Sequence, residues 1–416
     1  MKPGSNLSNL IWAVSEKILT IVLTLITTAA LARYFGVELF GSYQYAMSIL
    51  FVATSLTWLC PAEALFSKVK PDGTIENSII VTSIIYRFTV SILVWLGVFL
   101  YVMLYIESSS QLAFILILTI TLIYSEPLGV FRFLLECQGY YHLTARVRLF
   151  SLITKVSLTL IFVYFTLHPA IVIAPVVIET LLVSCLCYHL IKKYDKTLRV
   201  SLSHFDKKVA KMFFFEGIKL WFGLVCMNFF LKLDRLILQD KTSDKIFGLY
   251  SAAFSVLEQL TSLSTMIFAV LGPALIYRAS AVELQKNTLK LSGLMLCAGT
   301  IGATIMFFLS DYFIVFVYGD SYLESVAMFK MLVFVVPLVF FDLALNAFVI
   351  KNKSALFFFF KWLSVLLTAY IVMDTYLDSH GWLAGVYGYY AGFIAAVVIS
   401  LCYFYFYKTK GGSCRL

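Results

Sequence analysis

Short polar breaks divide this chain into long apolar runs. Each run is long enough to cross a bilayer as a helix, which takes roughly 20 apolar residues. The runs show no regular alternation of polar and apolar residues, and backbone polar groups in hydrocarbon must be hydrogen-bonded within their own segment. The pattern therefore predicts an all-α polytopic membrane protein with about twelve transmembrane helices. They are expected near residues 10–32, 41–66, 78–106, 111–136, 143–167, 170–191, 212–234, 245–276, 288–310, 326–350, 355–377 and 382–407.

Composition excludes most soluble functions. Charged residues make up 13% of the chain, whereas soluble domains have about 25%, so most of the surface must face lipid. A net charge of +9 would suggest nucleic acid in a soluble domain, but Lys and Arg accumulate in the cytoplasmic loops of membrane proteins, and no nucleic-acid partner is expected. The sequence has no nucleotide-binding, phosphate-loop, paired-carboxylate or metal-ligand pattern. We expect no catalytic residue, no metal site and no cofactor.

One short element occurs twice. FGSYQYAMS at 40–48 returns as FGLYSAAFS at 247–255, with five matches in nine positions and an offset of 247 − 40 = 207, almost half of the 416 residues. This spacing predicts two related halves. The small Gly41 and Gly248 are expected to let helices approach closely, while the rings of Tyr43 and Tyr250 are expected at the membrane interface.

The basic residues give a topology. They gather on one side of the predicted spans, above all in the break at 192–211, so the positive-inside rule places both termini in the cytoplasm. That break contains Lys192, Lys193, Lys196, Arg199, Lys207, Lys208 and Lys211. It predicts a six-helix lobe over 1–191, a basic cytoplasmic linker over 192–211, and a second six-helix lobe with a short basic cytoplasmic tail over 212–416. Because six is even, both halves enter the membrane in the same orientation, which makes the repeat parallel.

Ionisable residues inside the spans are the candidate functional groups. Such groups are costly in lipid and usually face a bundle interior or a wet cavity. The alternatives are that they pair as structural links or snorkel to the headgroups, and Lys17, Lys219 and Lys361 begin only about 10 Å from a span end. The deeper residues are Arg87, Glu126, Lys155, Glu179 and Glu258, and the remaining ones are Glu16, Glu216 and Asp342.

A family resemblance rests on two motif regions. The first is Ala32-Arg33-Tyr34-x-Gly36 followed by Gly41-x-Tyr43, and the second is Asp234-Arg235 followed by Gly248-x-Tyr250-x-x-Ala253. Together they resemble the polysaccharide-transport branch of the multidrug/oligosaccharidyl-lipid/polysaccharide (MOP) exporters, and the length and N-terminal sequence resemble Wzx-type O-antigen flippases. The resemblance implies a MATE-like fold of two six-helix lobes around a central cavity.

The resemblance also implies a task in lipopolysaccharide biosynthesis. Such proteins flip undecaprenyl-diphosphate-linked O-antigen or polysaccharide repeat units from the cytoplasmic to the periplasmic leaflet of the bacterial inner membrane by alternating access. The expected partners are this lipid-linked oligosaccharide, the bilayer, the O-antigen polymerase and the chain-length regulator. The motion would be driven by an H⁺ or Na⁺ gradient or by consumption of the product outside.

Depth in the membrane then suggests residue roles. Lys17, Arg87, Lys155 and Lys219 are candidates to bind the diphosphate, and Trp221 and Asn228 are candidates to bind sugar. The candidates for coupling are Glu16, Glu126, Glu179, Glu216 and Glu258, because a carboxyl in low dielectric can titrate at a useful pH.

Two other functions remain open at this point. A cation-coupled drug or small-molecule antiporter of the same fold is the first, although several deep cations count against it. A multispan oligosaccharide polymerase or ligase is the second, although it would be expected to have a large periplasmic loop, and the predicted outer loops are short.

Overall fold

The structure is a computed structural model that describes the chain except residues 1–5, 60–74, 196, 197, 199, 278, 353 and 410–416. Lys196, Arg199, the basic tail and the end of the predicted second span lie outside the described residues. Within the described part, every regular element is a helix. Ten of these helices are long and apolar enough to cross a membrane, and an eleventh span forms if α9 (Lys207–Phe230) and α10 (Leu233–Lys241), bent by 44°, are counted together.

Helix α1 (Asn6–Thr57) accounts for two of the twelve predicted spans. It is 52 residues long, far more than the roughly 20 residues that one crossing requires. Its helical geometry is interrupted at Gly36, where φ is 69° and ψ is 179°, a backbone conformation that is essentially restricted to glycine. The predicted short loop between the first two spans is therefore reduced to a break at one glycine.

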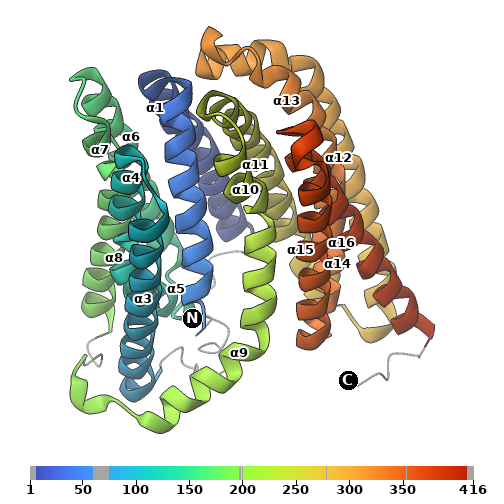
Figure 1. The fold of residues 1–416 in the computed structure, drawn as a ribbon. Coiled ribbons are helices and arrows are strands. Elements are labelled where there is room, and N and C mark those ends of the chain that lie inside the picture. Colours follow the sequence, from blue (N-terminus) through green and yellow to red (C-terminus); the bar gives the residue numbers. More distant parts are fainter. Residues whose placement is uncertain are drawn as a thin grey trace. The chain divides into compact units, whose positions relative to one another are not determined.

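The chain divides into two compact units, and the first consists of Met1–Tyr34 and Tyr45–Trp221. Helix α5 packs against α3 and α8, and α6 packs against α8 (Figure 1). The apolar core between them includes Phe131, Leu135 and Cys187. Its helices besides α1 are α3 (Asn77–Tyr105), α4 (Ser109–Thr119), α5 (Thr121–Cys137), α6 (Tyr141–Tyr164), α7 (Pro169–Val172), α8 (Ala174–Tyr194) and the first part of α9.

The second unit consists of Phe35–Gln44 and Phe222–Leu416. Helix α15 packs against α16, α12 against α14, and α11 against α13. An aromatic core forms where the ring of Phe230 meets Trp362, Tyr389 and Phe393. Its helices are the second part of α9, α10, α11 (Asp244–Gly272), η2 (Pro273–Tyr277), α12 (Ala281–Tyr318), η3 (Asp320–Tyr322), α13 (Ser325–Leu332), η4 (Val333–Val335), α14 (Val336–Lys351), α15 (Ala355–His380) and α16 (Leu383–Thr409).

The division between the units lies inside α9, whereas the sequence placed it in the linker at 192–211. Figure 1 shows α9 as a strongly curved helix. Its first half packs on the first unit, where Phe213 belongs to the apolar core and Trp221 Nε1 donates a hydrogen bond to the Leu56 carbonyl at 3.1 Å. Its second half packs on the second unit through Phe230. The two halves of α9 thus pack in different units, and the lobe boundary at the linker over 192–211 stays a prediction.

The two copies of the repeated element contact each other in the second unit. A Cβ added to Gly41 would lie 3.1 Å from the Cα of Gly248, and one added to Gly248 would overlap the carbonyl oxygen of Val37. The predicted close approach is confirmed, because only glycine fits at this crossing. The rings of Tyr43 and Tyr250 are both buried within the protein, and their position at the membrane interface stays a prediction.

Candidate functional site

A polar cavity of about 470 Å³ lies within the first unit. Helices α1, α3, α5, α6 and α8 supply its walls, so residues from the whole length of this unit meet around it. The charged and hydroxyl-bearing residues that line it are Thr20, Thr54, Arg87, Thr121, Ser125, Glu126, Arg132, Glu136, Arg148, Glu179, Thr180 and Ser184. Helices that are apolar enough to span a membrane therefore enclose a space rich in hydrogen-bonding groups.

Arg87 is the most deeply buried cation of this cavity, with an exposed fraction of 8%. It projects from α3, and its NH1 group donates a hydrogen bond of 3.3 Å to the backbone carbonyl of Glu126 on α5. A guanidinium offers five N–H donors in a planar fork that fits phosphate oxygens. This geometry is suited to binding an anionic group.

Ion pairs hold most of the other charges around the cavity. Glu16 accepts from Arg148 at 2.9 Å, and Glu179 pairs with Lys155 at 2.6 Å. Among the described acids of the wall, Glu126 has a carboxylate without an ion-pair or hydrogen-bond partner. The cavity thus contains one carboxylate that is available to take up a proton or a cation.

Five of the eleven predicted site residues therefore come together in the first unit. Arg87, Glu126 and Glu179 line the cavity, while Glu16 and Lys155 pair with residues of its wall. The sequence interpretation missed Arg132 and Glu136, which form an ion pair at 3.7 Å with an i, i+4 spacing. That spacing within a predicted span was the available signal.

The other predicted residues lie elsewhere. Lys17 is half-buried, and Glu216 and Lys219 are exposed on α9. Trp221 donates to a backbone carbonyl of α1, and Asn228 donates to the Leu224 carbonyl of its own helix at 2.9 Å. The Trp221 ring nitrogen is thus used between helices, and the Asn228 amide nitrogen within its own helix.

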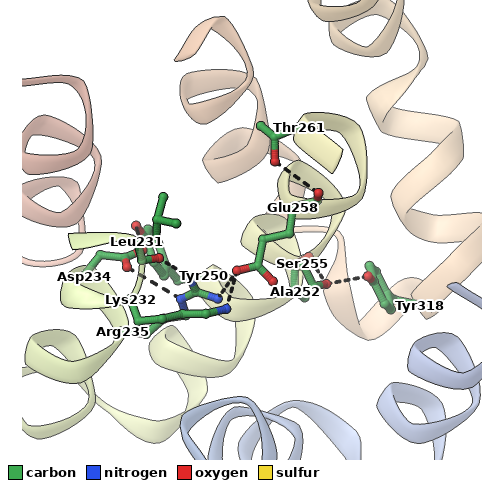
Figure 2. Close-up of polar contacts among 10 residues, drawn as sticks. All are labelled: Leu231, Lys232, Asp234, Arg235, Tyr250, Ala252, Ser255, Glu258, Thr261 and Tyr318. Carbon is green, nitrogen blue, oxygen red and sulfur yellow. Dashed lines mark hydrogen bonds and ion pairs between the residues drawn. The ribbon is translucent and has the colours of Figure 1, made fainter. Parts of the chain in front are cut away.

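A second group of charges, the helix-break cluster, comprises Lys232, Asp234, Arg235 and Glu258 in the second unit (Figure 2). It forms where α9 ends and α10 begins. A break leaves carbonyls at the end of a helix without intrahelical partners, and Arg235 NH2 donates to the oxygen of Leu231, directly after α9, at 2.8 Å.

Hydrogen bonds and ion pairs connect all four residues of the helix-break cluster. Lys232 Nζ and Arg235 NH1 both donate to the same oxygen of Glu258, at 2.5 and 2.7 Å. Tyr250 of the repeated element donates to Asp234 at 2.8 Å, and the Arg235 guanidinium lies over the ring of Phe254, 4.1 Å from its centroid. Glu258, predicted as a coupling residue, is here the acceptor for two cations.

A third group is sealed inside the second unit. Lys361 Nζ donates to both oxygens of Asp342, at 2.7 and 3.0 Å, and to Asn346 Oδ1 at 2.6 Å. Ser400 donates to the same carboxylate at 3.0 Å. Of the two alternatives for Lys361, a structural pair or snorkelling, the structure shows the pair, because Asp342 holds its ammonium among α14, α15 and α16.

Comparisons with known proteins agree on family and fold. A family model described as polysaccharide biosynthesis protein matches residues 7–277. Among solved structures, an inward-facing MATE multidrug transporter of the MOP superfamily aligns with a TM-score of 0.65 at 13% identity, over 98% of this chain and 100% of that one. The lipid II flippase MurJ in an inward closed conformation aligns with a TM-score of 0.66 at 14% identity, over 94% and 87%.

An outward-facing MATE multidrug transporter of the MOP superfamily aligns with a TM-score of 0.58 at 14% identity, over 97% of this chain and 96% of that one. No curated protein sequence matches the chain. These structural likenesses confirm the predicted MATE-like fold. The central cavity between the lobes stays a prediction.

Proposed function

We propose that this chain, which belongs to the polysaccharide biosynthesis protein family, translocates a lipid-linked oligosaccharide across a membrane. The substrate would be an undecaprenyl-diphosphate-linked O-antigen or polysaccharide repeat unit, moved from the cytoplasmic to the periplasmic leaflet of the bacterial inner membrane. Two comparisons support a task of this kind: the family match, and the fold shared with a protein that is named a lipid II flippase.

The observation that carries the proposal is Arg87 in the cavity of the first unit. A diphosphate loses its hydration when it leaves the headgroup region, so a translocation path must offer cations in return. The cavity volume of about 470 Å³ lies within the roughly 300–1,000 Å³ that is typical of small-molecule sites. It can admit a polar headgroup while the prenyl chain stays in lipid.

The hydroxyl groups of the wall suit sugars. Thr54 and Thr121 each donate to a carbonyl of the preceding turn, at 2.7 and 2.6 Å. Their oxygen lone pairs can then accept hydrogen bonds from sugar hydroxyls. A drug–cation antiporter would be expected to have a more acidic cavity, whereas three arginines balance the three glutamates of this wall.

Deletion and complementation test the proposal. Loss of the gene is expected to remove surface polysaccharide and to cause lipid-linked repeat units to accumulate in the cell. The wild-type chain should restore the surface polymer, and Arg87→Ala, at equal membrane abundance, should not. Arg146→Ala is the matched control, because Arg146 is exposed on α6 and is not part of the cavity wall.

Two results would overturn the proposal. Intact surface polysaccharide after deletion, in a host with no second transporter of this kind, would favour the antiporter function. Full restoration by Arg87→Ala would remove the cavity of the first unit from the translocation path.

A further inference from the structure

Two cations in the helix-break cluster depend on one carboxylate oxygen. Lys232 Nζ and Arg235 NH1 both donate to Glu258 Oε1, at 2.5 and 2.7 Å (Figure 2). The arrangement resembles the way in which two basic groups hold one oxygen of an anion, with a protein carboxylate in the place of the ligand.

The carboxylate is the accessible member of this group. The Glu258 side chain is 34% exposed, whereas those of Arg235 and Lys232 are 2% and 10% exposed. Glu258 therefore covers the cations from the open side. A competing anion can reach the position of Oε1 if the Glu258 side chain swings away, without any movement of α9 or α10.

The charges of the cluster require a replacement when Glu258 leaves. Asp234 lies 3.6 Å from Arg235 Nε and accepts a bond from Tyr250, so it balances one cation within the protein. Glu258 accepts from both Lys232 and Arg235. Displacement of its negative charge from two buried cations is unfavourable unless another anion takes its place. A metal cation would instead be repelled by the two cations already at this oxygen, which argues against Glu258 as a Na⁺ ligand.

The first copy of the repeated element has no acid at the position of Glu258. At the offset of 207, Glu258 corresponds to Phe51. The first half therefore builds its helix over this element, within α1, without the Glu258 carboxylate.

We propose that Glu258 is a displaceable counter-ion and that Lys232 and Arg235 form a binding site for a phosphate group. The inference rests on the proposed function in taking this group to be the diphosphate of the lipid-linked substrate. In the empty protein Glu258 neutralises the two cations, and in the loaded protein a phosphate oxygen takes its place.

Binding of inorganic pyrophosphate to the purified full-length chain tests the site. Glu258→Gln keeps the shape of the side chain and removes its charge, so isothermal titration should give a dissociation constant lower than that of the wild type by roughly tenfold or more, since two charge-assisted donors become available. Adding Lys232→Gln to this variant should abolish the gain. The control is Glu324→Gln, which removes the same charge from an exposed pair with Lys245 and should leave the affinity unchanged.

Three results would overturn the inference. Equal gains in Glu258→Gln and Glu324→Gln would show an effect of net charge alone. A gain that survives Lys232→Gln would place the anion elsewhere. Suppression of pyrophosphate binding in phosphatidylglycerol nanodiscs but not in phosphatidylcholine nanodiscs would assign the site to a lipid headgroup and not to the substrate.

The test does not depend on one variant or on the cellular phenotype. If Glu258→Gln does not fold, Glu258→Asp is the second variant. It retains the charge but withdraws the carboxylate by one carbon, so it should bind pyrophosphate more tightly than the wild type does. If Glu258→Asp showed no gain in affinity, the inference would be overturned. Because titration uses purified protein and pyrophosphate only, it can fail while the deletion phenotype is intact, and the two failures are distinguishable.

Discussion

Removal of the Lys361 ammonium should destabilise the protein much more than removal of both members of its ion pair. The side chains of Lys361 and Asp342 are 0% and 3% exposed. At 2.7 Å and an effective dielectric constant of about 20, their attraction is about 6 kcal/mol, and the loss of hydration opposes it. Lys361→Met cancels the attraction but leaves the Asp342 carboxylate buried, with only the Asn346 amide and the Ser400 hydroxyl as donors.

Breaking one side of such a buried pair costs about 3–5 kcal/mol, whereas replacing both partners with apolar residues of similar volume is often neutral or stabilising. We therefore expect Lys361→Met to lower the free energy of unfolding by about 3–5 kcal/mol and the Lys361→Met/Asp342→Leu double variant to recover most of that loss. The exposed pair of Lys245 and Glu324, with side chains 56% and 66% exposed, provides the control. Lys245→Met should cost less than about 1 kcal/mol.

Denaturant unfolding in detergent, followed by helical circular dichroism, measures the Lys361→Met, Asp342→Leu, double and Lys245→Met variants. The double-mutant cycle isolates the coupling between Lys361 and Asp342. If the double variant were as unstable as the sum of the two single variants, or if Lys361→Met cost no more than Lys245→Met, the argument from burial would be refuted.

Two further predictions concern the glycine crossing and the free acid of the cavity. Gly248→Ala should cost about 1–3 kcal/mol through overpacking, because its Cβ would overlap the Val37 oxygen, while Gly97→Ala, with nothing within 4 Å, should be neutral or slightly stabilising. Equal thermal midpoints in detergent for these two variants would contradict this. Glu126→Gln should keep the wild-type membrane abundance but lose any stimulation of translocation by an imposed H⁺ or Na⁺ gradient in proteoliposomes. If the gradient stimulated translocation by Glu126→Gln as much as by the wild type, Glu126 would be excluded from coupling.

The helices were predictable because their cause is local. An apolar run of sufficient length must form a helix in lipid wherever it lies in the chain, and the described parts of all twelve predicted runs match helices in the predicted order. The break at Gly36 was harder to place, because Gly36 is a single non-helical residue inside α1, which is helical before and after it. Polar residues near 33–40 suggested a loop, whereas the backbone freedom of one glycine is sufficient.

The partners of the charges were not predictable in the same way. Lys361 and Asp342 are 19 positions apart, and no local spacing indicates that α14 and α15 bring them together. Depth alone made snorkelling of Lys361 reasonable, because a lysine near a span end usually has water within reach. Here the packing of α14, α15 and α16 keeps water away from the Lys361 ammonium. The Asp234-Arg235 motif was visible in the sequence, but the convergence of Lys232 and Arg235 on Glu258 depends on the bend between α9 and α10.

Exposure, more than depth, separates the membrane-embedded charges that hold helices together from those that can meet a substrate. Lys361 and Asp342 are both sealed, so a ligand could reach them only if α14, α15 and α16 came apart, at the cost of an apolar core. Arg87 and Glu126 line a cavity, and Glu258 covers two buried cations from an accessible side. These three groups can exchange partners by side-chain motion alone. A cycle that binds and releases an anion needs such exchange, because a charge fixed in an inaccessible pair contributes equally to the loaded and the empty state and cannot favour one of them.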